Sequence, residues 1–159
     1  MKVKKSISDY IMDILCWVLV IGIPIYLIIA WKNIPNEIPM HYDAMGNVDR
    51  LGDKSELLIL PIMTFLMCSF ISVLELFPQV WNTGVKITEE NKERVFRVLK
   101  NMIKTTKLIV VADFSFMTIN SILGKNLPVW FSPVFIIKDI MRYYEGVVSL
   151  MIRKIILLF

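Results

Sequence analysis

The chain's only histidine, His41, lies in a short polar segment with three aspartates close by in sequence, Asp43, Asp49 and Asp53. Imidazole and carboxylate groups can bind a metal ion together, and an imidazole can exchange protons near neutral pH. A histidine and an aspartate could also contact a ligand or peptide. The simplest alternative is that His41 forms a local hydrogen bond while the aspartates cap turns. We favour this alternative, because a lone histidine without cysteines is a weak metal signal. We predict no metal and no cofactor.

A second group of charged residues interrupts long apolar runs: Asp13, Glu75 and Asp113. A charge at the centre of a bilayer is costly, so each carboxylate needs a partner or a route to water. We favour the interpretation that all three reach the headgroup region at the cytoplasmic ends of their helices. The sharper hypothesis is an intramembrane polar cluster in which they pair with Lys138 and Arg142.

The elements that carry these residues are apolar and long. Of the 159 residues 56% are hydrophobic, and they come in unbroken runs. A membrane-spanning helix needs about 20 apolar residues. The sequence therefore predicts an all-α membrane protein, a bundle of about four transmembrane helices with one ordered extracytoplasmic loop. We treat residues 1–159 as one membrane domain. The predicted spans are residues 11–31, 57–81, 106–123 and 127–144.

The C-terminal segment is the least regular of these. Only 11 apolar residues, 127–137, precede Lys138, and the charged residues that follow fall on one stripe of a helix. This pattern predicts an amphipathic helix over about 138–159. It either continues the fourth span or lies along the inner membrane surface, and we favour a crossing followed by an interfacial tail.

Lysine and arginine next to the spans predict the orientation. They gather before the first span and between the second and third, whereas the first loop carries more carboxylates than cations. By the positive-inside rule both termini are cytoplasmic and the first loop lies outside. The expected location is a bacterial cytoplasmic membrane. Because the basic residues flank apolar runs, we expect no nucleic-acid partner.

The segment between the second and third spans, residues 88–107, has the pattern of a basic amphipathic helix. Thr88 is a good N-cap, with Glu89 and Glu90 in the first turn. We predict a surface helix that leads straight into the third span. Its basic face is either solvated near anionic lipid, which we favour, or docks a cytoplasmic partner.

The predicted outer loop, residues 33–55, contains residues that restrict its backbone. Pro35 and Pro39 favour an extended start that continues through residues 40–42. Residues 43–46 are typical of a turn, with Gly46 free to adopt a positive φ. Gly52 permits a second reversal just before the second span, where Ser55 is the expected N-cap. The sequence thus predicts an ordered loop.

The loop resembles a signature of a bacterial membrane family, the domain of unknown function 1648, found in SdpI-type proteins that give immunity to the sporulation-delaying toxin. The resemblance covers about residues 10–80. It implies a small multi-span protein of the cytoplasmic membrane, some of whose relatives protect against a secreted peptide toxin. The charged fourth segment departs from the more apolar last span expected of the family. The residues that carry the resemblance, and that we take as the candidate ligand-binding set, are Pro39, His41, Tyr42, Gly46, Asp49, Gly52 and Lys54.

The sequence lacks the common enzymatic motifs, such as a phosphate-binding glycine loop or H-E-x-x-H. We therefore predict that the protein is not an enzyme. An acid–base role for His41 with Asp49 is the weakest hypothesis. The first hypothesis is immunity to, or sensing of, a secreted peptide toxin through the outer loop. The second is a regulatory or assembly subunit that binds a cytoplasmic protein through its basic helix. Under both hypotheses the chain is embedded in the lipid bilayer, which is therefore one of its partners.

Overall fold

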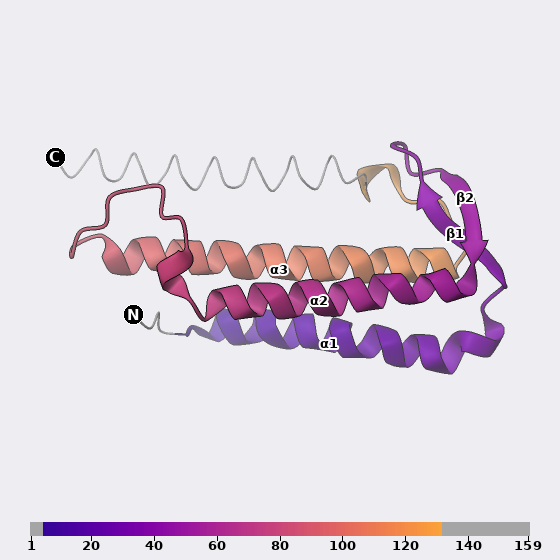
Figure 1. Cartoon of the computed structure of the whole chain (residues 1–159), viewed down its shortest axis with the longest axis horizontal. Coiled ribbons are helices and arrows are strands. Elements are labelled where there is room, and N and C mark those ends of the chain that lie inside the picture. The colour runs from indigo at the N-terminus through magenta and orange to yellow at the C-terminus, as the bar shows by residue number, and fades with distance from the viewer. Residues whose placement is uncertain (1–4, 132–159) are drawn as a thin grey trace.

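The computed structural model describes residues 5–131, and every structural statement below concerns that part of the chain. Three long helices run side by side, with a two-stranded β-hairpin at one end (Figure 1). The start of α1 and the link between α2 and α3 lie at the opposite end. We call these the hairpin end and the charged end. The elements are α1 (Ile7–Ala30), β1 (Glu37–Tyr42), β2 (Val48–Asp53), α2 (Ile59–Glu75) and α3 (Lys92–Ile122), with short 3-10 turns η1 (Trp31–Asn33), η2 (Lys54–Leu58), η3 (Pro78–Val80) and η4 (Val129–Phe131).

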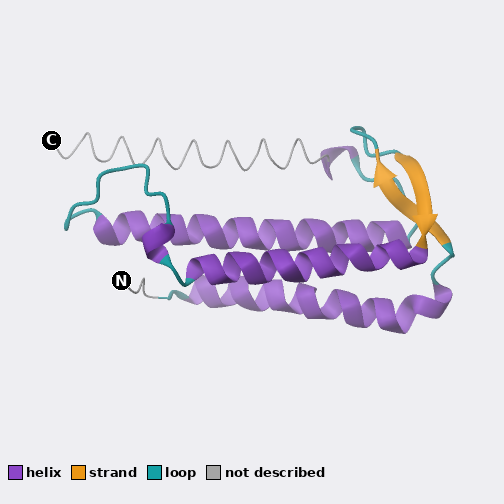
Figure 2. Cartoon of the chain, viewed as in Figure 1, coloured by secondary structure: helices purple, strands orange, loops and turns teal. Residues whose placement is uncertain are grey.

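The prediction of an all-α chain was wrong for the first loop. Residues 37–53 form an antiparallel hairpin of β1 and β2, which caps the ends of the helices (Figure 2). The extended stretch at residues 40–42 was predicted correctly; it continues the extended backbone that Pro35 and Pro39 favour in the residues just before them. The partner strand, Val48–Asp53, was not predicted.

The helix ends follow local chemistry. Ser6 begins α1 with a capping box, in which its hydroxyl accepts from the Asp9 backbone N–H and the Asp9 carboxylate accepts from the Ser6 N–H. Asp53, not Ser55, caps the turn that leads into α2. α2 ends at Glu75 rather than near residue 81, because Pro78 disfavours helical backbone in the residue before it.

The predicted surface helix and the third predicted span form one continuous helix, α3. It starts at Lys92, four residues after Thr88, and the Thr88 hydroxyl accepts from the Asn91 N–H in the turn before it. The fourth predicted span, 127–144, enters the described residues only through η4. Its remainder and the amphipathic helix expected at 138–159 lie outside them.

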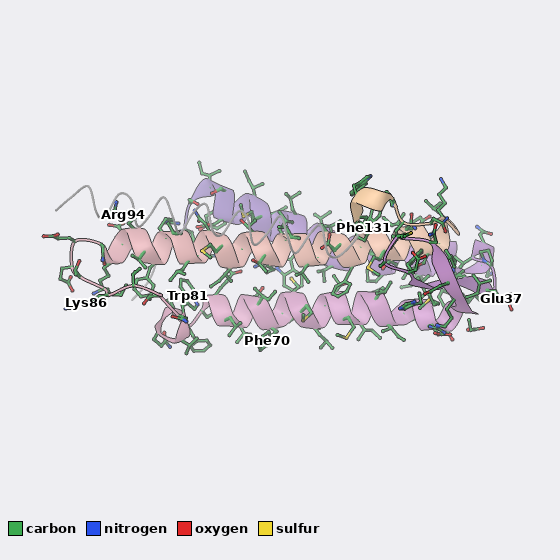
Figure 3. All side chains as sticks on the ribbon, turned by 90° about the horizontal axis from the view of Figure 1, so that it is seen from above. Glu37, Phe70, Trp81, Lys86, Arg94 and Phe131 are labelled. Atoms are coloured by element: carbon green, nitrogen blue, oxygen red, sulfur yellow. The ribbon has the colours of Figure 1, made fainter. Side chains whose placement is uncertain are left out.

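Two segments are long and apolar enough to cross a membrane, Ile7–Asn33 and Lys54–Glu75. Only 17% and 22% of their most apolar stretches are buried in the protein. Large apolar side chains such as Ile28, Ile29 and Phe70 are exposed, and Figure 3 shows Phe70 on the side of α2 turned away from α3. A core helix of a soluble domain would bury such groups, so these observations support a membrane protein.

The buried residues form three zones along the bundle. At the hairpin end, an apolar cluster joins the last turns of α1 to the loop and to η2, the turn before α2. Its members are Ile23, Leu27, Ile34, Ile38 and Leu57. A second apolar cluster consists of Cys16, Val20, Cys68 and Val111. At the charged end the interior is ionic. Ser115 and Thr118 lie on α3 between the two apolar clusters. Their buried hydroxyls donate to carbonyls four residues earlier, at 2.7 Å each, so they need no partner from another helix.

Candidate functional site

The hairpin turn is closed by Asp43 and Gly46. The Asp43 carboxylate accepts from the backbone N–H groups of Met45 and Asn47, both at 2.8 Å. The Gly46 N–H donates to the Asp43 carbonyl at 3.0 Å. Gly46 has a φ of 87°, a conformation that favours glycine. The predicted turn and the predicted positive φ are both confirmed.

Gly46 also attaches the hairpin to the segment that follows α3. Its carbonyl accepts from the Leu127 N–H at 2.7 Å, and the Val48 N–H donates to the Asn126 side-chain oxygen at 3.0 Å. A Cβ at position 46 would lie 2.6 Å from the Leu127 carbonyl oxygen. Glycine is therefore required at position 46 by close packing as well as by the turn.

Tyr42 forms a second attachment, at the end of α3 itself. Its hydroxyl lies 3.3 Å from the Ser121 hydroxyl, and the Asn120 side-chain amide donates to it at 3.4 Å. The same amide donates to the Lys125 carbonyl at 2.6 Å. Tyr42 thus joins β1 to the last turn of α3, more than 70 residues away in sequence.

A bulge in β1 directs His41 outward. The strand register is irregular between Pro39 and His41 and again between His41 and Tyr42. On a regular strand, residues two apart point to one face, yet Pro39 is buried and His41 is exposed. His41 Nδ1 lies 2.6 Å from Asp49 Oδ1, with 65% and 43% of the two side chains exposed. The result is a solvent-accessible hydrogen-bonded pair on a fixed backbone.

Gly52 and Lys54 lie at the base of the hairpin, where β2 leads into the turn before α2. Gly52 lies within β2 and has no positive φ, so the predicted second reversal at this residue was wrong. A Cβ there would lie 2.5 Å from Glu56 Oε1 and 2.8 Å from Met40 Cγ, so any larger residue would require the Glu56 and Met40 side chains to move. Lys54 Nζ lies 5.6 Å from the centre of the Trp31 ring, a cation–π contact. Its backbone N–H donates to the Asn36 carbonyl at 2.9 Å.

Two hairpin aspartates act as caps, as the simplest interpretation of the sequence predicted. The Asn47 backbone N–H, helped by the Asn47 side-chain amide, lowers the pKa of Asp43 because it binds the charged carboxylate. Ser55 lowers the pKa of Asp53 in the same way. Among the described residues no group of three or more His, Cys, Asp and Glu side chains is placed to hold a metal ion.

The seven candidate residues therefore divide into two kinds. Pro39, Tyr42, Gly46, Gly52 and Lys54 shape the hairpin or fasten it to the helix ends. His41 and Asp49 offer exposed polar atoms to the surroundings. Within residues 5–131 the second ring nitrogen of His41 makes no hydrogen bond, so it can donate to or accept from a ligand.

A separate ionic site lies at the charged end. We call it the lysine–carboxylate cluster; it consists of Asp9 and Asp13 from α1, Glu75 from α2, and Lys100, Lys104 and Lys107 from α3. Lys104 is fully buried, and Asp9 and Lys107 are almost so. Three carboxylates face three ammonium groups, and two further cations lie at the edge of the cluster, with Arg97 Nη1 3.2 Å from Asp9 Oδ2 and Lys5 Nζ 3.7 Å from Asp13 Oδ2.

The contacts of the cluster join all three helices. Lys104 Nζ lies 2.6 Å from Asp13 Oδ1 and 3.0 Å from Glu75 Oε2. Lys107 Nζ lies 3.0 Å from Asp13 Oδ1 and 2.6 Å from Glu75 Oε1, the latter an ion pair whose angle does not suit a hydrogen bond. Lys100 Nζ donates to Asp9 Oδ2 at 2.9 Å. Each of the two central lysines therefore bridges α1 and α2.

These partners differ from those predicted from the sequence. Asp13 and Glu75 pair with lysines of α3, whereas Lys138 and Arg142 lie outside the described residues. Asp113 forms no ion pair with residues 5–131 and is not part of the lysine–carboxylate cluster.

The spacing of charged residues along the chain is the sequence signal for the cluster. Lys100, Lys104 and Lys107 follow the spacing of one helix face, and Asp9 and Asp13 stand one turn apart on another helix. The prediction of a solvated basic face was wrong for these three lysines, because carboxylates from two other helices cover them.

Comparison with known proteins gave a family match that covers the hairpin region. The sequence model of one family, the domain of unknown function DUF1648, matches residues 18–65, less than half of the chain. Neither the comparison with curated proteins nor that with solved structures gave a match. The matched range runs from within α1 through the hairpin into α2, and lies inside the range 10–80 of the resemblance described above. Residues 18–65 are thus similar to the domain of unknown function DUF1648.

Proposed function

We propose that the chain is a multi-span membrane protein of SdpI-like type whose hairpin faces the cell exterior and recognises a secreted peptide toxin. The exposed His41–Asp49 pair carries the proposal. The other residues of the loop signature hold this pair on a fixed frame, which is the arrangement that a recognition site needs. Protection against the toxin would follow from its capture at the membrane surface.

The surface of the hairpin supports a peptide ligand. Met45 and Leu51 are 74% and 56% exposed, so apolar contacts are available near the polar pair. Residues 37–53 carry four carboxylates, Glu37, Asp43, Asp49 and Asp53, and one cation, Arg50. This excess of negative charge favours a cationic peptide.

The proposed orientation rests on the distribution of charge along the sequence. α1 and α2 cross the membrane, α3 follows as the third span, and residues 127–144 form the fourth, so that both termini are cytoplasmic. The hairpin end then lies outside, and the lysine–carboxylate cluster lies near the inner surface. The bacterial cytoplasmic membrane is the proposed location.

The structure gives less support to a cytoplasmic docking role for residues 88–107. Lys100, Lys104 and Lys107, which would supply much of the basic face, are buried against carboxylates of α1 and α2. A soluble acidic partner cannot reach them without separating the helices. We therefore keep toxin recognition as the one proposed function, without catalysis.

Survival of a toxin-sensitive strain tests the proposal. Cells that express the full chain, with membrane expression confirmed, should survive the sporulation-delaying toxin better than cells with an empty vector. His41→Ala and Asp49→Asn should lose protection, because each removes one member of the exposed pair.

Glu37→Gln is the matched control, since it removes one exposed hairpin carboxylate that lies outside the pair. It lowers the charge of the hairpin by the same amount as Asp49→Asn but leaves the pair intact, so it should retain clearly more protection than Asp49→Asn. Equal killing with and without the parent chain would reject immunity to this toxin. Full protection by both His41→Ala and Asp49→Asn would reject the proposed site.

A further inference from the structure

The three long helices differ in how well they suit a bilayer. α3 has 31 residues and is about 46 Å long, enough to cross. Yet among the described residues only the segments that contain α1 and α2 are apolar enough to count as candidate spans. The buried face of α3 carries Lys100, Lys104 and Lys107. Their positive charges must be neutralised before this face can be buried.

The compensating groups all belong to other helices. Lys104 and Lys107 each contact Asp13 of α1 and Glu75 of α2, at distances between 2.6 and 3.0 Å. Lys107 Nζ also donates to the Ser72 hydroxyl of α2 at 3.3 Å. No single helix can neutralise these lysines, and α1 together with α2 can.

We infer that Asp13 and Glu75 form a docking site for Lys104 and Lys107, and that α3 enters the membrane only against α1 and α2 already in place. The inference rests on the membrane location proposed above. α1 and α2 are apolar enough to insert first and also precede α3 in the chain. Without these counter-charges the ammonium groups would hold α3 at the inner surface, because burial between the helices would remove them from water with no compensation.

Two cysteine reporters in the full chain separate this inference from the proposed orientation. Met45→Cys places a thiol on the exposed hairpin turn, and Lys125→Cys places one just after α3, where the native side chain is exposed. The native Cys16 and Cys68 are fully buried and should stay unlabelled. In intact cells a membrane-impermeant maleimide should label both reporters.

The decisive variant combines Asp13→Asn and Glu75→Gln. Labelling at Lys125→Cys should fall roughly tenfold, because two lysines of α3 lose their counter-charges. Labelling at Met45→Cys should persist, because α1 and α2 still insert. The matched control is Glu90→Gln with Glu93→Gln, which removes two exposed carboxylates at the same end and should change neither signal.

A neutral variant distinguishes docking from general damage. Adding Lys104→Gln and Lys107→Gln to Asp13→Asn and Glu75→Gln removes the charges that need compensation, so labelling at Lys125→Cys should return. Unchanged labelling in the first variant, or no recovery in the neutral one, would overturn the docking inference. Absent labelling of Met45→Cys in the otherwise native chain would overturn the orientation, and the inference with it.

Discussion

The hairpin end and the charged end fasten the same three helices by different interactions. At the hairpin end, neutral hydrogen bonds from Tyr42 and Gly46 supplement an apolar cluster. At the charged end, Lys104 is fully buried between carboxylates of α1 and α2. Loss of a neutral hydrogen bond has a modest cost, whereas loss of one member of a buried ion pair leaves an uncompensated charge. The two ends should therefore respond very differently to single substitutions.

The largest effect should come from Lys104→Met at the charged end. The substitution keeps an unbranched side chain but leaves Asp13 and Glu75 short of a counter-charge. The free energy of unfolding should fall by about 3–5 kcal/mol. Unfolding of the purified protein in detergent micelles, followed by circular dichroism, measures it. A Lys104→Met, Glu75→Gln double variant should lose less than the sum of its two single variants. Strictly additive losses would contradict the comparison.

Gly46→Ala should have the next largest effect, because the new Cβ would meet backbone atoms, which cannot move aside as a flexible side chain can. The new Cβ would lie 2.6 Å from the Leu127 carbonyl oxygen, at a φ of 87°. The unfavourable φ alone should cost about 1–3 kcal/mol. Gly84→Ala is the control, since Gly84 has a φ of 62° but nothing within 4 Å of its Cβ. Only Gly46→Ala should also speed tryptic cleavage at Lys125; equal cleavage in both variants would show that the contact does not hold this segment.

Tyr42→Phe should produce a smaller loss. It removes the hydroxyl that meets Ser121 and Asn120, at a cost of about 0.5–1.5 kcal/mol in the free energy of unfolding. Tyr26→Phe, at an exposed site on α1, should be indistinguishable from the parent in the same detergent unfolding assay. If the two phenylalanine variants behaved alike, the Tyr42 attachment would contribute nothing measurable.

The smallest effect should be a loss of hairpin protection in acid. Folding lowers the pKa of Asp43 and of Asp53 below the ordinary value of 3.8, so the folded hairpin binds fewer protons there than the unfolded chain. The stabilisation is complete above that value and is lost as the pH falls through the lowered pKa values. Hydrogen-exchange protection of the Asn47 amide should decrease over this range. Asp43→Asn should weaken the pH dependence, and an unchanged profile would contradict the assignment.

Features set by local sequence could be predicted. Prolines and Gly46 determine the extended strand and the turn, because each restricts or frees the backbone at its own position. The apolar runs predicted both ends of α1 and the start of α2 to within four residues, whereas α2 ends at Glu75 and not near residue 81. The extended first strand and the turn could therefore be derived from the sequence, whereas the second strand and its pairing with the first were missed.

Features set by contacts between distant residues could not be derived in the same way. Lys100 and Asp9 are 91 residues apart in sequence, and lysines beside an apolar run look the same whether water or a carboxylate surrounds them. The close approach of the Glu56 and Met40 side chains to Gly52 likewise depends on packing rather than on backbone conformation. Acidic and basic residues at matching helical spacing on separate helices, as in Asp9, Asp13 and the three lysines, are the pattern that indicates such a cluster.

The hydrogen bond from Leu127 to Gly46 has a mechanical consequence. With the bond from the Val48 N–H to Asn126, it closes the intervening chain, which includes α2 and α3, into a large non-covalent ring. Displacement of the hairpin turn would pull directly on the segment after α3 and on the aromatic contacts that Phe131 makes with Phe116. An event at the turn would thus reach the start of the C-terminal residues without passing through the helix interior.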